Sequence, residues 1–241
     1  MATRKNSSKT APRRASTRVP KDFPAGTAPA GTRGVEGRAL SIAREAYVLT
    51  GGVCPLYRAH IYDLLASAPG AGRRNVGALA LGSAERVLPY FTRARPNDDR
   101  AERLVALARQ ALMTDDPATL AEARDIAGSA FHEIVCLAPP SAAAAGLAAV
   151  SALSEAAGDD PLASARASLT EGTQDDLLDP ESSDAARWAA AACRFGENGD
   201  ETGHFKMCAI KAEMAFWSDW LDRVEALSAG GRRGAARPGT G

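Results

Sequence analysis

The pattern of apolar and polar positions predicts helices through the middle of the chain. Alanine and leucine recur at helical spacing, whereas no stretch alternates apolar and polar residues as a half-buried strand would. The β-branched and aromatic residues that favour strands are sparse. The predicted fold class is therefore all-α, a multi-helix bundle of about eight to nine helices.

Residues that cap helices mark several of the predicted boundaries. Pro96 ends one helix, and Asn97 or Asp98 can cap the helix that follows. Asp116 can cap another helix, because Pro117 after it suits the first helical position. Further helices are expected near 38–49, 54–68 and 75–94, from Pro140 and Ser141 to Gly158, after Asp160, from Ser182 or Ser183 to Gly196, and from Gly203 to Leu227.

The closing helix is the longest of the predicted helices and has a wide apolar face. Phe216, Trp220 and Val224 follow one another at i+4 spacing, and Trp217 and Leu221 form a second stripe beside them. Large aromatic side chains at helical spacing usually belong to a core. We therefore predict that this helix packs deeply against its neighbours.

Both ends of the chain depart from the helical pattern. Residues 1–36 have no apolar period and are rich in proline, glycine, serine and threonine, so they cannot bury enough surface to offset chain entropy. The last dozen residues have a similar composition. We predict a disordered basic tail at 1–36, an all-helical domain at 37–229 and a flexible tail at 230–241.

The net charge of zero hides a segregation of charge along the chain. Residues 1–34 contain eight lysines or arginines and one acidic residue, whereas residues 110–229 contain 21 acidic and 7 basic residues. A body this acidic disfavours nucleic acid as its partner and favours a protein with a basic surface. Contact with nucleic acid is expected, if at all, only through the N-terminal tail.

The densest acidic stretch, residues 171–184, contains six carboxylates and no lysine or arginine. Four interpretations are open: a metal cage, a catalytic carboxylate pair, a surface that repels all but a basic partner, or a solvated loop with a helix cap at its end. A calcium loop is disfavoured, because DDLLDP lacks the glycine and the alternating oxygen ligands that such a loop needs. Residue types alone do not decide between the four.

The cysteines and histidines give little sign of a metal site. The four cysteines contain no C-x-x-C pair, so we predict buried, reduced thiols. His132 with Cys136, and His204 with Cys208, have i+4 spacing and could together close a zinc site. The spacing matches no common zinc signature, so packing in the core is favoured and no metal is predicted.

Catalytic motifs are also missing from the sequence. No nucleophile motif or phosphate-binding glycine loop accompanies His60, and the clustered carboxylates do not resemble a tuned acid and base. The H-E-x-x-C that begins at His132 lacks the second histidine of a metalloprotease. We predict a protein that is not an enzyme, with no catalytic residue and no cofactor.

The sequence contains no sign of membrane insertion or secretion. It has no run of about eighteen apolar residues, and its first thirty residues have no apolar signal-peptide core. The predicted location is therefore the cytoplasm.

Three stretches carry short motifs in a fixed order. ERVLPYFTRARPNDDRAERLVALAR contains L-x-x-F and then P-x-D-D-R, DDLLDPESSD precedes an alanine-rich helix, and AFWSDWLD holds two tryptophans. The matching residues are Leu88, Phe91, Pro96, Asp98, Asp99, Arg100, Asp175, Leu178, Asp179, Pro180, Asp184, Phe216, Trp217, Trp220 and Leu221. Over residues 85–225 these stretches resemble an all-helical family of immunity proteins of bacterial polymorphic-toxin systems, immunity family five.

The resemblance implies a protein that binds a cognate secreted toxin inside the producing bacterium and neutralises it by occlusion. Most signature residues are then expected to be structural, and the acidic stretch to face the toxin. The hypothetical binding residues, on an exposed connection between two helices, are Asp175, Asp176, Asp179, Glu181 and Asp184. Asp184 is expected to have a second role, because an acidic side chain stabilises the first turn of a helix.

The alternative function is a non-enzymatic helical adaptor whose basic tail attaches the acidic body to nucleic acid. Deletion of residues 1–34 separates the two hypotheses. An immunity protein should keep its toxin binding after the deletion, whereas the adaptor should lose its attachment to nucleic acid.

Overall fold

The computed structural model describes residues 40–45, 47–48, 52–67, 72–163, 184–196 and 207–235, all within the unit formed by residues 33–241. Within these ranges the backbone forms helices and the turns between them, and no strand. The predicted all-α class is therefore confirmed. In the part of the chain described, no helix is both long and apolar enough to cross a membrane.

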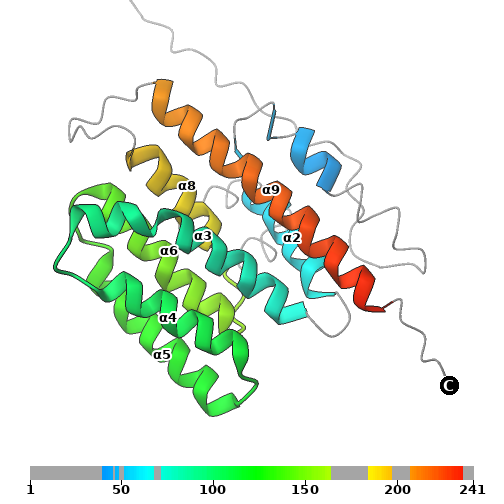
Figure 1. Cartoon of the computed structure of the whole chain (residues 1–241), viewed down its shortest axis with the longest axis horizontal. Coiled ribbons are helices and arrows are strands. Elements are labelled where there is room, and N and C mark those ends of the chain that lie inside the picture. Colours follow the sequence, from blue (N-terminus) through cyan, green and yellow to red (C-terminus); the bar gives the residue numbers. More distant parts are fainter. Residues whose placement is uncertain are drawn as a thin grey trace, which may run out of the picture. The chain divides into compact units, whose positions relative to one another are not determined.

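The helices lie alongside one another in Figure 1. Their order is α2 (Pro55–Ala66), α3 (Gly72–Ala94), α4 (Arg100–Met113), α5 (Pro117–Ile134), α6 (Pro140–Ala156), α8 (Ala185–Gly196) and α9 (Met207–Ala235). Residues 40–45 and 47–48 are also helical. Helix α9 continues to Ala235, past residue 230, where the sequence predicted the start of a flexible tail. Once a helix has formed, each residue added to its end gains one backbone hydrogen bond, which favours such an extension.

The predicted caps are correct in part. Asp116 caps α5, because its Oδ2 accepts a hydrogen bond from the backbone N of Thr119 at 2.9 Å. The prediction for α4 was wrong by one residue, since the N-cap is Asp99. Asp98 accepts hydrogen bonds from the Arg100 side chain with both carboxylate oxygens, and its Oδ1 also accepts from the backbone N of Arg100 at 3.3 Å.

The core is built around α6, which contacts α3, α4, α5 and α8. Thirteen of its seventeen residues are buried, most of them alanine. A helix that is apolar on all sides is suited to the centre of a bundle, and small side chains let neighbouring backbones approach closely. Gly146 marks one such approach, because a Cβ at this position would lie 2.6 Å from Ile134 Cγ2 and 3.1 Å from Phe91 Cε2.

Replacement of Gly146 with alanine is expected to lower the free energy of unfolding by about 1–3 kcal/mol, because overpacking outweighs the helix propensity of alanine. Gly128→Ala is the matched control: it lies in α5, and a Cβ there meets no atom within 4 Å. The control should gain about 0.5–1 kcal/mol. Urea unfolding followed by circular dichroism measures both. Equal effects of the two substitutions would contradict the close approach at Gly146.

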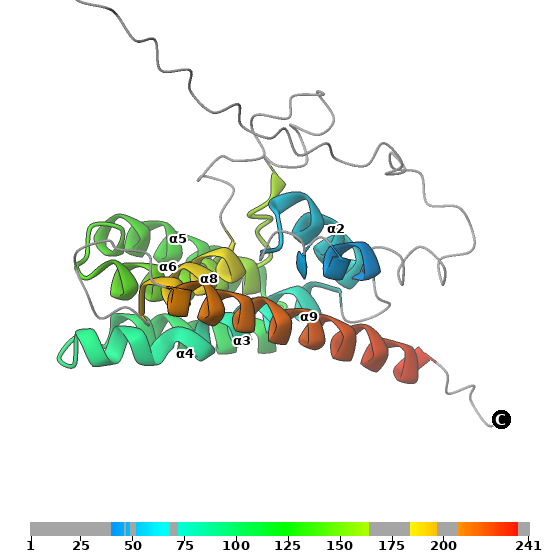
Figure 2. The same ribbon diagram turned by 90° about the horizontal axis from the view of Figure 1, so that it is seen from above.

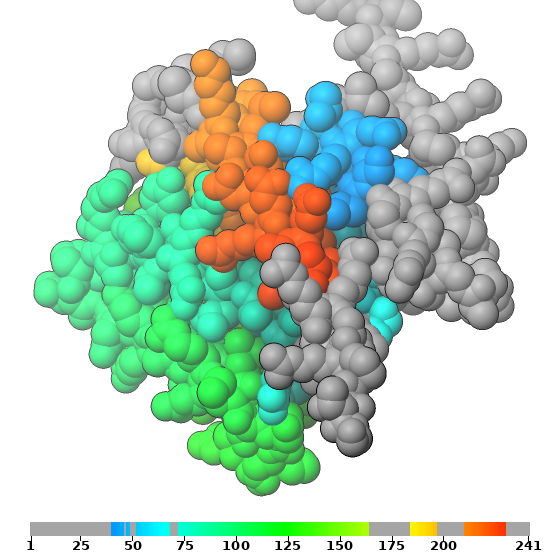
Figure 3. Space-filling view, turned by 45° about the vertical axis from the view of Figure 1, so that its right-hand side comes forward, coloured from blue at the N-terminus to red at the C-terminus, as the bar shows by residue number. Residues whose placement is uncertain are grey.

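The aromatic face of α9 is buried, as predicted. Phe216, Trp217, Trp220, Leu221 and Val224 are at most 2% exposed. The Trp217 ring meets the Phe216 and Trp220 rings edge to face, with centroids 5.2 and 5.7 Å away. In Figure 3, α9 lies between α3 and residues 40–48. Helix α9, the last in the chain, therefore packs beside the first described helix.

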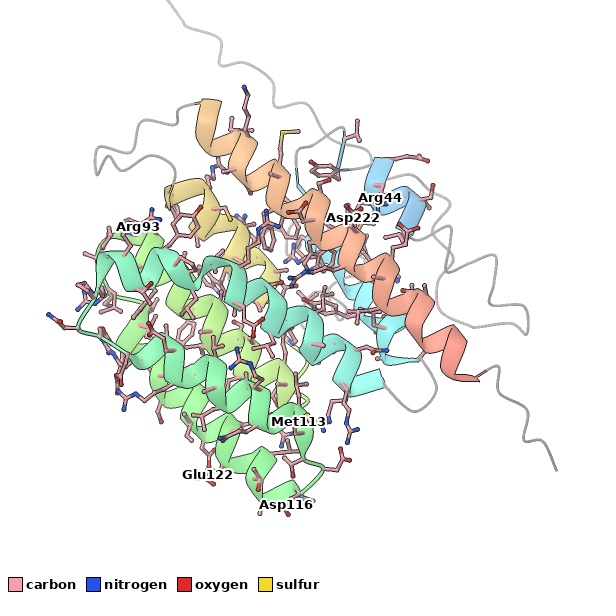
Figure 4. The ribbon with its side chains drawn as sticks, viewed as in Figure 1. Arg44, Arg93, Met113, Asp116, Glu122 and Asp222 are labelled. Atoms are coloured by element: carbon pink, nitrogen blue, oxygen red, sulfur yellow. The ribbon has the colours of Figure 1, made fainter. Side chains whose placement is uncertain are left out.

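Residues 40–45 and 47–48 contact α9 through ion pairs and a hydrogen bond. Arg44 donates to Asp222 at 2.7 Å and to Glu225 at 3.0 Å, and Figure 4 shows Arg44 turned toward Asp222. Tyr47 Oη also donates to the backbone O of Met214 at 2.7 Å. Residues 40–48 and α2 lie on the same side of α9 in Figure 2.

The prediction of buried thiols was correct for Cys193 and wrong for Cys54 and Cys136, which are exposed. Cys54 is the N-cap of α2, and Cys136 lies in the turn after α5, so both fall outside the buried faces of their helices. His132 is also exposed, and its expected packing in the core was therefore wrong. The side chains of His204 and Cys208 lie outside the described residues.

Candidate functional site

Four polar side chains meet inside the apolar core and form what we call the buried ionic cluster. Its members are Arg58 and Tyr62 of α2, Glu155 of α6 and Asp184 at the start of α8. Each is at most 3% exposed. Since buried charges are costly unless paired, the partners of these side chains matter, and they link α8 to both α2 and α6.

Asp184 satisfies two kinds of donor at once. Its Oδ1 accepts from the backbone N of Arg187 at 2.8 Å, which caps α8, and its Oδ2 accepts from Arg58 Nε at 2.8 Å. A carboxylate at a helix N-terminus is favoured by the partial positive charge of the unpaired N–H groups. Asp184 therefore starts α8 and fixes it to α2.

Arg58 crosses from α2 to the preceding turn and to α9. Its Nη1 donates to the backbone O of Val53 at 2.6 Å, and its guanidinium lies over the Trp217 ring, 5.6 Å from the centroid. A cation over a tryptophan face is attracted by the ring quadrupole. The signature residues Asp184 and Trp217 thus contact the same arginine.

Glu155 supplies a second carboxyl group to the N-terminus of α8, because its Oε1 accepts from the backbone N of Ala185 at 2.7 Å. Burial, and then the charge of Asp184, raise the pKa of Glu155 well above its usual value. Burial likewise raises the pKa of the Tyr62 phenol. A neutral Glu155 leaves one positive and one negative charge in the cluster, which balances it.

The structure corrects one predicted position in the acidic stretch. Asp184 is fully buried rather than exposed, because its carboxylate is used by the α8 backbone and by Arg58. The predicted cap at Ser182 or Ser183 was also wrong, since Asp184 takes this position. The other hypothetical binding residues, and the signature Pro180, lie outside the described residues: Asp175, Asp176, Asp179 and Glu181.

Sequence reasoning missed Arg58, Tyr62 and Glu155. A usable signal was present, because Arg58 lies among Leu56, Ala59 and Ile61, and Glu155 is the one charged residue of α6. A charged residue in an otherwise apolar helix predicts a buried partner. The identity of that partner was beyond the sequence, since Arg58 and Asp184 are 126 positions apart.

The chain is anchored where it enters and leaves the segment that holds the acidic stretch. On the entering side Leu162 is fully buried, and its backbone N donates to Asp160 Oδ1 at 3.1 Å. On the leaving side Asp184 is fixed in the buried ionic cluster. The described ends of this segment are thus held by the helical core.

The other signature motif, at the α3–α4 connection, also forms ionic contacts. Asp98 accepts from Arg95 Nε at 3.0 Å and from Arg100 Nη2 at 2.6 Å, and Arg100 lowers the pKa of Asp98 well below its usual value. Arg100 also reaches Glu133 at 3.2 Å. Asp99 pairs with Arg103 on the surface. These contacts tie the connection to α5, while Pro96 lies in the turn itself.

No metal centre is assembled by the part of the chain described, where no group of three or more His, Cys, Asp or Glu residues could hold an ion. The zinc interpretation joined His132 and Cys136 to a second pair, whose side chains are outside this part.

The all-helical fold agrees with the immunity-protein class that the motifs indicated, and the signature residues Asp184 and Trp217 both contact the buried Arg58. A family model described as Immunity protein Imm5 matches residues 57–226, and the chain belongs to this family. The matched range includes the whole buried ionic cluster. Comparisons with curated proteins and with solved structures gave no match.

Proposed function

We propose that this protein neutralises a toxin of a bacterial polymorphic-toxin system by binding it in the cytoplasm of the producing cell. The mode of action is occlusion of the toxin by a protein surface, without a catalytic step on the toxin. Membership of the Imm5 family supports the immunity function. The charge distribution supports a partner with a basic surface.

The observation that carries this proposal is the position of the unbalanced negative charge. The described residues include 17 lysines and arginines and 19 aspartates and glutamates, so they are close to neutral. Most exposed acids on the described helices are ion-paired, as Asp219 is with Arg86 and Asp222 with Arg44. The acidic stretch, by contrast, has no lysine or arginine of its own.

Unbalanced charge of this density costs stability through mutual repulsion, whereas a basic partner converts the repulsion into attraction. A toxin that acts on an anionic substrate, such as a nuclease domain, would present such a basic surface. Association with it would be steered by charge and would weaken as salt is added. The binding residues in this proposal are Asp175, Asp176, Asp179 and Glu181.

The test replaces Asp175, Asp176 and Glu181 together with their amides and measures association with the toxin encoded beside this protein. We expect an association rate about tenfold slower at low salt, with a shallower salt dependence and unchanged folding. Surface plasmon resonance at low and high salt gives both quantities.

The matched control removes the same charge elsewhere, by amide substitution of Asp99, Glu122 and Asp125. These side chains are exposed on α5 and at the start of α4. Figure 4 shows Glu122 in the N-terminal part of α5. The control should associate at close to the wild-type rate. If the two triple variants slow association equally, the effect is one of net charge, and the acidic stretch has no special role.

A further inference from the structure

The buried ionic cluster places two carboxyl groups at the same end of one helix. Glu155 Oε1 accepts from the backbone N of Ala185 at 2.7 Å, and Asp184 Oδ1 accepts from the backbone N of Arg187 at 2.8 Å. Both N–H groups belong to the first turn of α8, so the two carboxyl groups are neighbours. Each side chain is at most 1% exposed, so water does not screen one from the other. Two negative charges at this position would therefore repel each other strongly.

The nearby arginines balance only one of the two carboxyl groups. Arg58 Nε donates to Asp184 Oδ2 at 2.8 Å. Arg187 turns toward α9, where its Nη1 lies 3.5 Å from Glu213 Oε1. Asp184 therefore keeps its negative charge. Glu155, whose hydrogen bond to α8 comes from a backbone N–H, is the carboxyl group that holds a proton.

The other ionisable groups around Glu155 do not supply a counter-charge. Arg73 of α3 lines the same pocket, but its guanidinium donates to backbone oxygen atoms and to Asp115 at 2.9 Å. The Tyr62 phenol of α2 stays neutral, because burial raises its pKa. The remaining ionisable residues that line the pocket are acids, which disfavour a further negative charge: Asp63, Asp159 and Asp160.

We propose that the start of α8 is a pH-sensitive switch, in which Glu155 holds a proton while α8 packs on α6 and frees α8 when it ionises. An ionised Glu155 would leave two negative charges and one positive charge inside an apolar core, which is costly. Separation of α8 from α6 lets water reach the carboxylate and removes this cost. Because α8 also contacts α3 and α9, its release lowers the stability of the whole fold.

The direction of the pH effect follows from the state in which the proton is held. In the folded chain burial, and then the charge of Asp184, raise the pKa of Glu155 well above its usual value of 4.5, and they outweigh the attraction of Arg58. In the unfolded chain the carboxyl group returns to that usual value, so folding takes up one proton at neutral pH. The stability due to this proton is complete below the unfolded pKa. It is lost as the pH rises through the folded pKa.

The experiment compares urea unfolding of the full wild-type chain and of Glu155→Gln from about pH 5.5 to about pH 8.5. The amide keeps the size of the side chain and an oxygen acceptor for Ala185 N, but it cannot ionise. We expect the variant to gain stability relative to wild type as pH rises. The ratio of the two unfolding constants should change by up to about tenfold per pH unit, the limit for one proton. Glu122→Gln, an exposed acid of α5, is the matched control and should follow the wild-type pH profile.

Parallel pH profiles of wild type and Glu155→Gln would overturn the inference, because they would show that Glu155 takes up no proton on folding. A second measurement needs no variant and so decides if Glu155→Gln does not fold. It records the carboxyl-carbon NMR signals of wild type with isotope-labelled glutamate at neutral pH. One signal should have the chemical shift of a protonated acid, whereas a full set of ionised glutamates would refute the proposal.

Hydrogen exchange tests whether α8 is the part that is released. After correction for the pH dependence of intrinsic exchange, the amide hydrogens of α8 should lose protection earlier than those of α4 as pH rises. Equal loss of protection in α4 and α8 would contradict a switch at α8. None of these measurements requires the toxin, so their outcome is independent of the proposed function.

Discussion

Asp184→Ala is expected to lower the free energy of unfolding by about 3–5 kcal/mol, because it leaves the Arg58 charge buried without a partner. The substitution also removes the cap of α8. Since small domains are stable by only about 5–15 kcal/mol, a substantial part of the stability would be lost. Urea unfolding of the full chain, followed by circular dichroism, measures the change.

Asp116→Ala is the matched control for this prediction. Asp116 also caps a helix, accepting from Thr119 N at 2.9 Å, but its side chain is exposed and has no ion pair that the structure describes. Its loss should cost only about 1 kcal/mol. Similar losses for the two aspartates would show that the buried pair with Arg58 adds nothing beyond the cap.

Trp220→Ala is expected to cost about 3–5 kcal/mol, the range for removing a large aromatic side chain from a core. Trp220 is 2% exposed and packs against Trp217 and Tyr62, with ring centroids 5.7 and 6.3 Å away. The cavity left between α2 and α9 cannot be filled by side chains that are already in contact. The thermal midpoint and the urea midpoint should both fall.

The control for Trp220 is Trp188→Ala in α8, a tryptophan that is only partly buried. A smaller loss is expected, because less of its surface leaves water on folding. If Trp188→Ala proved as damaging as Trp220→Ala, the centre of the aromatic core would lie nearer α8 than the structure shows.

Local features of the chain were predictable from its sequence. The start of α5 follows from Asp116 and Pro117, and the buried face of α9 follows from aromatic residues at helical spacing. Both signals operate within a few residues, so chain order alone reveals them. The start of α4 was one residue off: the N-cap is Asp99, while Asp98 before it bonds the backbone N of Arg100 as well as arginine side chains.

The candidate site was much less predictable, because it depends on residues that are distant in sequence. Nothing near Asp184 indicates that its partner is Arg58, or that Glu155 also reaches the start of α8. The many acidic residues near Asp184 in the sequence predicted an exposed side chain. Asp184 is nevertheless fully buried, where it forms an ion pair with Arg58. Exposure of Cys54 and Cys136 likewise depends on where helices end, which is the least certain part of a sequence-based prediction.

The pairing of Arg44 with α9 has a consequence for synthesis on the ribosome. Asp222 follows Arg44 by 178 residues, so the first described helix cannot complete its contacts until the end of the chain has been translated. At bacterial rates of about 5–20 residues per second, this interval is roughly ten to forty seconds. A newly made chain therefore completes this part of its fold only after α9 has been synthesised, so the packing of its first described helix is one of the last folding events.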